Sequence, residues 1–389
     1  MALGNERSGS KTLLPLLISV PVLLGFAITA YYLWAEAAAS RNQAMRDRVI
    51  WDARDVAALI QPTINHTRQL ARLIEQARTA GAERDIIKGL AVPTLDLRRE
   101  FLGVAVVFEP NGFDGRDVDY EGKLPENDGN GRFSAYYYRE TGKPAATAVL
   151  EMAELSNTEG WYGIPLKTGR PALSLPYLYP VDGIERSISS VSVPIQDAGK
   201  SVGVTTIDFF MTEIEKKVLA LKSTEIIGAW IVSADGLWVV HQDKTKVGSQ
   251  LTLGVAGPEG EIEMFRRRGG TARTGTPQTH EAENGVNYLM TPIALDGVDQ
   301  SWFLVVAQQP VSLLEGTPKD TTKMATILGV TLLVGIMALA QVWLTSRGGK
   351  SPTSKSAPRP VSATATAPSN LKAKSRPPLS RREPTVRRR

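Results

Sequence analysis

Aromatic and acidic side chains gather in one stretch of the chain, although only 7% of its residues are aromatic. The aromatic members are Tyr136, Tyr137, Tyr138, Trp161, Tyr162, Tyr177 and Tyr179. Glu159 lies among them and Asp208 follows. Ring faces attract ammonium groups by about 0.5–2 kcal/mol each, and carboxylates add countercharge. The set therefore predicts a site for an amine, a polyamine or a quaternary ammonium compound, while Arg139 and Arg186 leave a carboxylate ligand open as an alternative.

Strand geometry sorts these tyrosines into pairs. Successive side chains of a strand point to opposite faces, so Tyr136 and Tyr138 are predicted to share one face, as are Tyr177 and Tyr179. For any single tyrosine, ordinary packing is an equally good explanation. The binding hypothesis depends on the set.

Several kinds of chemistry find no support in the sequence. There is no cysteine, which excludes thiol catalysis and disulfides. The three histidines, His66, His241 and His280, lack the spacing of metal ligands. No nucleophile elbow or phosphate-binding loop is present. We therefore expect no enzyme activity, no metal and no cofactor.

Two long uncharged segments lie near the ends of the sequence. Residues 12–34 and 324–346 each hold 23 residues without a charged side chain, enough at 1.5 Å per residue to cross a hydrocarbon core of about 30 Å. A cleavable signal peptide would have a shorter apolar core than the first segment, and a buried helix as long as the second would be expected to carry charge. The sequence therefore predicts two transmembrane helices.

Basic residues predict the orientation of these helices. The segment after Ser346 holds twelve Lys and Arg residues against one Glu, and the N-terminus carries Arg7 and Lys11. Because positive residues stay on the cytoplasmic side, both termini are predicted to be cytoplasmic, with residues 35–323 on the other side of a bacterial inner membrane. The basic excess belongs to one tail, so the pI of 9.2 does not indicate a nucleic-acid partner. The tail is predicted to be disordered, in contact with anionic lipid or with a signalling protein.

The hydrophobic period changes once between the two segments. Apolar residues recur at three- and four-residue steps over 35–80, which predicts a long helix ended by Gly81. From Phe101 the apolar runs are short and separated by turn residues, with one helix over 211–222. The expected fold is α+β, with two successive sets of antiparallel strands. Strands are predicted over 101–110, 131–140, 171–180, 186–195, 200–209, 224–233, 236–243, 285–293 and 301–310.

Several of these stretches resemble the double Cache family of extracytoplasmic sensors, as carried by methyl-accepting chemotaxis proteins. Four resemble the membrane-distal module of that family: FEPNGFDGRDVDY, GRFSAYYYR, EGWYGIPLKTGRPALSLPYLYPVDG and VSVPIQDAGKSVGVTTIDF. Two resemble the membrane-proximal module: IVSADGLWVVHQDKTKVGSQL and SWFLVVAQQP. Together they extend over about residues 35–320 in the family's order.

The resemblance implies two tandem PAS-like modules on one long helix, with the ligand in the distal module. Amino-acid-binding members carry an Arg-x-Trp-Tyr motif, then Tyr-x-Asp and a later Asp. Matching positions here hold Trp161, Tyr162, Tyr177 and Asp208. Glu159 stands where the Arg would be, and Tyr179 where the first Asp would be. An arginine fork would pair the ligand carboxylate, so these departures disfavour a standard α-amino acid as ligand.

These expectations divide the whole chain and define one candidate site. The predicted segments are a cytoplasmic N-terminus (1–11), transmembrane helix 1 (12–34), a stalk helix (35–80), the distal module (81–215), the proximal module (216–323), transmembrane helix 2 (324–346) and a basic cytoplasmic tail (347–389). The candidate ligand-binding residues are Tyr136, Tyr138, Glu159, Trp161, Tyr162, Tyr177, Tyr179 and Asp208.

The predicted function is that of a membrane-anchored sensor for a small solute, signalling through a separate cytoplasmic or membrane protein. The resemblance also implies a homodimer. Because the chain lacks a cytoplasmic signalling hairpin after residue 346, a non-signalling scaffold that binds a solute or a protein, or a truncated receptor, is the alternative.

Overall fold

The computed structural model describes residues 10–123, 126–140, 143–149, 160–271, 276–299, 301–309 and, apart from 331 and 342, residues 329–344. The chain divides into two compact units, Met1–Leu23 with Thr331–Arg389 and Leu24–Val330. The described strands all lie in the second unit. The described residues of 329–344 are helical.

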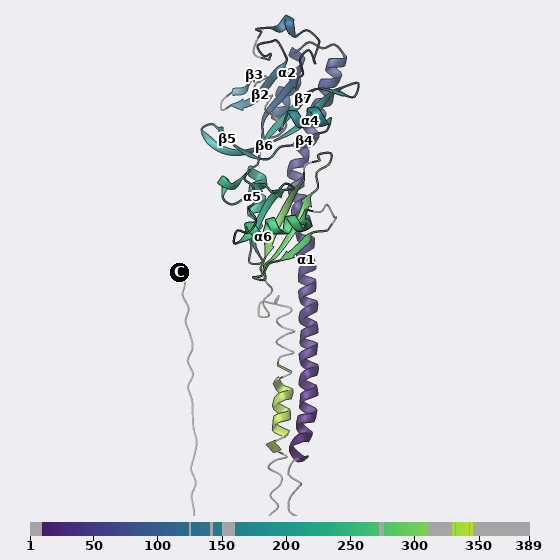
Figure 1. Ribbon diagram of the computed structural model, residues 1–389, viewed down its shortest axis with the longest axis vertical. Coiled ribbons are helices and arrows are strands. Elements are labelled where there is room, and N and C mark those ends of the chain that lie inside the picture. The colour runs from purple at the N-terminus through teal and green to yellow at the C-terminus, as the bar shows by residue number, and fades with distance from the viewer. Residues whose placement is uncertain are drawn as a thin grey trace, which may run out of the picture. The chain divides into compact units, whose positions relative to one another are not determined.

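Helix α1, Ser10–Thr79, is the longest described element, with 70 residues. Its predicted end is confirmed, because Gly81 takes a φ of 70°, in the left-handed region that stops a helix. Within the second unit it runs beside both sheets (Figure 1). One side of it is buried through an apolar stripe at helical spacing: Met45, Val49, Ala53, Val56, Ile60, Ile64, Leu70 and Ile74.

The predicted membrane spans extend beyond what the structure describes. The side chains of residues 10–20 and 22 and all of residues 324–328 lie outside the described part. Searched over the described residues alone, no helix is both long enough and apolar enough to cross a membrane.

The first sheet follows α1 and is antiparallel in each of its strand pairs. Its order is β3-β2-β1-β7-β6-β4, and β5 pairs with β6 beyond this path. The strands are β1 Phe101–Phe108, β2 Ser134–Glu140, β3 Lys143–Val149, β4 Ala172–Leu173, β5 Tyr177–Val181, β6 Ile184–Asp197 and β7 Lys200–Phe210. The helical segments around this sheet are α2 Asp85–Asp96, η1 Asp117–Tyr120 and α4 Gly163–Thr168. The strand predicted over 171–180 is thus two strands, β4 and β5, separated around Pro176.

A second antiparallel sheet follows α5, Thr212–Leu219, which is the helix predicted over 211–222. Its order is β10-β11-β12-β8-β9. The strands are β8 Ile226–Ser233, β9 Trp238–Val240, β10 Gln278–Glu281, β11 Asn287–Ile293 and β12 Trp302–Gln308. The helical segments are η2 Lys244–Lys246, α6 Pro258–Phe265 and η3 Arg266–Gly270. Two antiparallel sheets with helices confirm the predicted α+β class.

Alternation along the strands divides each sheet into two faces. On the first sheet, Val104, Tyr137 and Phe209 belong to the same core as the buried stripe of α1. On the second sheet, Ile231 and Leu304 join that core. The opposite face of the second sheet packs a separate cluster around Trp230, Trp238 and α6. The opposite face of the first sheet carries the candidate site.

Candidate ligand-binding site

Strand register brings the predicted tyrosines and Asp208 to the face of the first sheet that α1 does not cover. Asp208 on β7 pairs with Gly103 on β1 and with Ser190 on β6. Gly103 pairs in turn with Tyr138 on β2. Since directly opposed residues share a face, side chains from β2, β7 and β6 meet on this one. We call the resulting set the Asp208 cluster: Tyr136, Tyr138, Tyr177, Tyr179, Ser190 and Asp208.

Asp208 is the centre of this cluster. Its Oδ2 accepts a hydrogen bond of 2.8 Å from the Tyr136 hydroxyl, and its Oδ1 accepts one of 2.6 Å from the Ser190 hydroxyl. The residue is only 9% exposed, and in the described part of the chain no Lys, Arg or His is paired with it. Burial raises the pKa of Asp208, and the two hydroxyl hydrogen bonds only partly oppose this effect. The site thus holds a desolvated carboxyl group whose ionised form lacks a cationic neighbour.

The tyrosines surround this carboxyl group from two sides. The rings of Tyr136 and Tyr138 stack with centroids 5.6 Å apart, and those of Tyr177 and Tyr179 meet edge to face at 6.5 Å. Burial, followed by the negative charge of Asp208, raises the pKa of both Tyr136 and Tyr177. Both hydroxyls therefore stay protonated donors at neutral pH.

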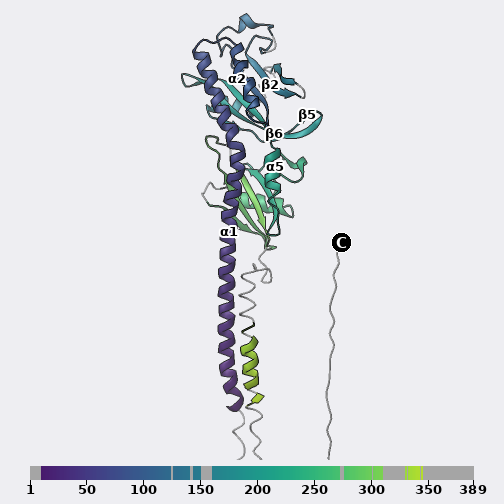
Figure 2. The ribbon, with the colours of Figure 1, turned by 180° about the vertical axis from the view of Figure 1, so that it is seen from behind.

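The hairpin that carries Tyr177 and Tyr179 extends outward from the rest of the sheet in both views (Figures 1 and 2). Tyr177 and Tyr179 remain 42% and 46% exposed. The predicted sharing of faces is confirmed, since Tyr177 pairs with Ile188 and Tyr179 with Arg186, on the same side of β6 as Ser190. Ring faces that remain open to solvent can receive a ligand.

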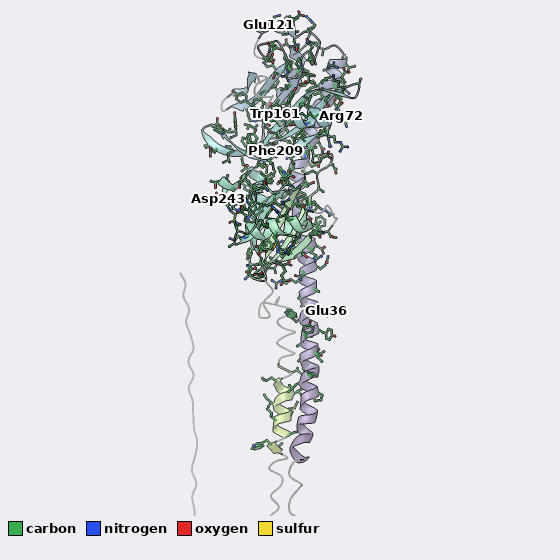
Figure 3. All side chains as sticks on the ribbon, in the orientation of Figure 1. Glu36, Arg72, Glu121, Trp161, Phe209 and Asp243 are labelled. Atoms are coloured by element: carbon green, nitrogen blue, oxygen red, sulfur yellow. The ribbon has the colours of Figure 1, made fainter. Side chains whose placement is uncertain are left out.

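Trp161 and Tyr162 lie farther along the same face, next to α4. Both pack with Val107 and Val204, and Val204 precedes Asp208 by four residues on β7. The Tyr162 hydroxyl accepts a hydrogen bond of 2.7 Å from Arg132 and donates one to Glu109. Tyr162 is therefore an anchor for the turn into α4. Trp161 is half-buried beside it (Figure 3).

The remaining predicted contributors fall elsewhere. Glu159 lies outside the described residues. Tyr137 points to the α1 side, where it is fully buried. Arg139 donates hydrogen bonds to Asp96 and to the carbonyls of Leu95 and Phe101. Arg139 is thus engaged by the α2 region and away from the Asp208 cluster.

Two residues of the site could not be recognised from the sequence. Ser190 belongs to a serine-rich strand, and only the register with Asp208 selects it from its neighbours. Gly103 leaves space on β1: a Cβ there would lie 2.1 Å from the Tyr136 hydroxyl oxygen. Among the described residues, no group of three or more His, Cys, Asp or Glu side chains is placed to hold a metal ion.

The sheet that carries this site matches a known sensor family. Residues 88–216 match the family described as methyl-accepting chemotaxis protein-like, first PDC sensor domain. The methyl-accepting chemotaxis protein TlpQ of Pseudomonas aeruginosa is 33% identical over 129 residues. That match includes 30% of this chain but only 18% of TlpQ.

Solved structures extend the likeness of the fold to both sheets. The extracellular domain assigned to a histidine kinase, mmHK1S-Z3, aligns over 73% of this chain and 97% of its own, with a TM-score of 0.55 and 23% identity. The periplasmic sensory domain of the Campylobacter jejuni chemoreceptor Tlp1 aligns over 68% of this chain and 95% of its own, with a TM-score of 0.50 and 16% identity. At these identities the likeness concerns the fold.

Proposed function

Since the chain carries a PDC/Cache-type sensor domain of the methyl-accepting chemotaxis protein kind, we propose that it is a membrane-anchored sensor that binds a small organic cation at the Asp208 cluster. The observation that carries this proposal is the buried Asp208 carboxyl group, held by two hydroxyl donors and by no described cationic side chain. A carboxylate in that position is costly to keep ionised until a cation arrives.

The aromatic surroundings fit the same ligand class. Tyr136 and Tyr138 present a stacked pair of rings, and Tyr177 and Tyr179 present part-exposed rings on the other side. An ammonium group near Asp208 would gain from the negative ring faces as well as from the carboxylate. Trp161 and Glu159 remain proposed contributors at the α4 side of the site.

The proposed arrangement in the cell follows from the two uncharged segments. Residues 12–34 and 324–346 would span the inner membrane, both termini would be cytoplasmic, and residues 35–323 would lie in the periplasm as modules 81–215 and 216–323 on the stalk helix. The chain would act as a homodimer and signal through a separate cytoplasmic or membrane protein. This topology can be tested with a reporter enzyme that is active only when exported, fused after residue 389. Activity of that fusion would contradict the predicted cytoplasmic C-terminus.

Ligand-dependent stabilisation tests the sensor function. Thermal unfolding of the purified full chain in detergent would be followed with alkylamines, polyamines, quaternary ammonium compounds, amino acids and organic acids. A cation present at a hundred times its dissociation constant should stabilise the folded state by about 2.7 kcal/mol. Asp208→Asn should abolish the effect, whereas Asp235→Asn, at an exposed carboxylate in the turn between β8 and β9, should preserve it. Stabilisation by organic acids alone would contradict the proposal.

A further inference from the structure

One short segment contacts both the Asp208 cluster and the loops of the second sheet. It consists of residues 170–176, which follow α4, include β4 and end directly before Tyr177. We call this segment the 170–176 linker. Its middle is hydrogen-bonded to Ser190, a member of the cluster, and its two ends lie against two different loops of the second sheet.

Ser174 fixes the middle of the linker to β6. Its backbone N–H donates to the Ser190 carbonyl at 2.9 Å, and its hydroxyl oxygen accepts from the Ser190 N–H at 2.9 Å. Its carbonyl oxygen accepts from the Ser189 hydroxyl at 2.8 Å. All three polar groups of Ser174 are thus bonded to two adjacent residues of β6. Because the Ser190 hydroxyl binds Asp208, Ser174 positions one of the two donors of that carboxyl group.

The ends of the linker reach the second sheet. At one end, the Pro176 carbonyl lies beside Gly248, where a Cβ would be 3.6 Å from the carbonyl oxygen. At the other end, Arg170 forms an ion pair of 3.0 Å with Asp299. Pro176 is buried and is joined to Tyr177 by one peptide bond, so a displacement of Tyr177 changes the contact at Gly248.

The loop that contains Gly248 is held in place by two ion pairs. Lys244 pairs with Glu215 of α5 at 3.4 Å, and Lys246 pairs with Glu259 of α6 at 2.6 Å. A force on Gly248 is therefore passed to both helices of the second sheet that these lysines contact.

The loop that contains Asp299 is attached to α1. The Asp296 N–H donates to the Gln61 side chain at 2.8 Å, and the Asp296 carbonyl accepts from Arg68 at 2.8 Å. Val298, next to Asp299, is buried in the core that α1 shares with both sheets. A movement of the linker therefore acts on α1 as well as on the second sheet.

We propose that the 170–176 linker transmits occupation of the Asp208 cluster to the second sheet and to α1, with Ser174 as its positioning residue. This inference rests on the proposed function of Asp208 as a cation site. A bound cation draws the part-exposed rings of Tyr177 and Tyr179 toward it, which displaces the linker from its ligand-free contacts. A ligand shifts a conformational equilibrium only through contacts that differ between the two states, and these rings supply that difference.

Cross-linking of the purified full chain tests the transmission. The chain has no cysteine, so an engineered pair supplies the only thiols. Arg170→Cys with Asp299→Cys, the 170/299 pair, is joined by a short bis-methanethiosulfonate. The matched control is Glu213→Cys with Lys216→Cys, at an ion pair of 2.8 Å within α5. The side chains of the two pairs are almost equally exposed, at 69% and 66% against 66% and 67%.

The probes are the alkylammonium ions from methylammonium to hexylammonium. The ion that binds wild type most tightly should slow the cross-linking of the 170/299 pair. By reciprocity, a cross-link formed without ligand should weaken the binding of that ion by about fivefold or more, relative to the same variant before cross-linking. The control pair should show neither effect. If an ion binds wild type but either quantity stays unchanged for the 170/299 pair, the inference is wrong.

Substitutions of Ser174 test its positioning role at a saturating concentration of the same ion. Ser174→Ala removes the acceptor for the Ser190 N–H and should abolish the effect of the ion on the cross-linking rate, whereas Ser174→Thr keeps the hydroxyl and should restore it. Ser233→Ala is the matched control, because the Ser233 hydroxyl also accepts from a backbone N–H, that of Leu237 at 3.0 Å. A full response in Ser174→Ala would overturn the role proposed for Ser174.

Failure of the inference and failure of the proposed function give different results. If an ion stabilises wild type but not Asp208→Asn, and the 170/299 pair does not respond to it, Asp208 is a cation site and the linker does not transmit its occupation. If the ion binds Asp208→Asn as tightly as wild type, or if no alkylammonium ion binds wild type, the proposed function is wrong and the inference falls with it.

Discussion

Gly103 determines how Tyr136 reaches Asp208. Tyr136 is on β2 and Asp208 on β7, with β1 between them. The tyrosine side chain crosses β1 directly over Gly103, where a Cβ would lie 2.1 Å from the hydroxyl oxygen. The absence of a side chain at this position is therefore what allows a hydrogen bond of 2.8 Å between residues on non-adjacent strands.

Replacing Gly103 by alanine should displace Tyr136 from Asp208. Overpacking of this kind costs about 1–3 kcal/mol, and the affinity for an alkylammonium probe should fall with it. Gly89→Ala is the matched control, because a Cβ there meets nothing within 4 Å and alanine in a helix gains up to about 1 kcal/mol. Denaturant unfolding and titration of both variants check this. A Gly103→Ala protein with wild-type affinity would contradict the assigned role.

The sequence predicted the members of this site better than their roles. Period-two alternation was enough to place Tyr136 with Tyr138, and Tyr177 with Tyr179, on shared faces. The role of Tyr162 as an anchor, in contact with Arg132 and Glu109, depends on the order of the strands in the sheet. Alternation along a single strand carries no information about that order. The same limit explains why Ser190 went unrecognised: its importance comes only from lying opposite Asp208.

At the scale of elements, the hairpin of β5 and β6 holds two of the four tyrosines. Its turn, Asp182–Gly183, takes φ values of 52° and 76°. The turn between β6 and β7, Ala198–Gly199, has nearly the same conformation, with φ values of 48° and 82°. Two-residue turns with positive φ at both positions match the twist of the strands that they join.

These two turns provide a matched pair of substitutions. Gly183→Ala and Gly199→Ala both place a Cβ where nothing lies within 4 Å, so each should cost about 1–2 kcal/mol from backbone strain alone. Only Gly183→Ala should weaken the binding of an alkylammonium probe, because Gly183 is four and six residues from Tyr179 and Tyr177, whereas Gly199 is nine residues from both Ser190 and Asp208 on the hairpin that carries them. Equal losses of affinity in the two variants would show that the β5 hairpin has no specific role.

A second element-scale feature is the loop between β1 and β2, which Arg84 fastens to the start of α2. Arg84 is 4% exposed and pairs with Asp114 and Asp117, each at 2.7 Å. Its guanidinium also lies 3.9 Å from the centroid of the Tyr120 ring. Burial alone would raise the pKa of Asp114, but hydrogen bonds and charge from Arg84 hold the pKa of that carboxyl below its usual value.

Arg84→Met should destabilise the protein by about 3–5 kcal/mol at neutral pH, because it leaves buried carboxylates without a cation. Since the folded-state pKa of Asp114 is lowered, its stabilising effect is present above the ordinary carboxyl pKa and is lost as the pH falls through the folded value. The difference in the free energy of unfolding between wild type and Arg84→Met should therefore become smaller in acid. Denaturant unfolding from pH 7 to pH 3 measures this, with exposed Arg116→Met as control. A difference in the free energy of unfolding that stays the same from pH 7 to pH 3 would contradict the role assigned to the pairing of Arg84 with Asp114.

Most strands could be predicted from the sequence, and the short helical elements could not. Apolar runs between turn residues identified β1, β2, β6, β7, β8, β11 and β12. Helix α2 was missed because Gly89 and Pro93 interrupt its short apolar pattern, and α4 and α6 have six and eight residues, too few for a helical period to emerge. A hydrophobic pattern predicts a helix or a strand only when the element is long enough for the pattern to repeat within it.

At the scale of the folded unit 24–330, α1 joins the two sheets into one core. Buried residues of α1 from Met45 to Ile74 form a single cluster with residues of the first sheet and of the second. The face opposite α1 differs between the sheets. In the second it is packed by Trp230, Trp238 and α6, whereas in the first it presents the Asp208 cluster. This contrast explains why the proposed ligand site belongs to the first sheet.

The buried Asp208 should also make the stability of the ligand-free protein depend on pH. Because burial raises the folded-state pKa of Asp208, its ionised form opposes folding. This contribution should grow as the pH rises from the ordinary carboxyl pKa through the raised folded value. Asp208→Asn removes the charge but keeps an acceptor for the hydroxyls, so the variant should lack this part of the pH dependence.

The most direct test of the account is thermal unfolding of the full chain and of Asp208→Asn at pH 7, each with and without a saturating alkylammonium ligand. The account predicts that the variant is at least as stable as wild type without ligand, and that only wild type gains stability when the ligand is added. Equal stabilisation of the two proteins by the ligand would contradict the central claim that Asp208 binds the cation.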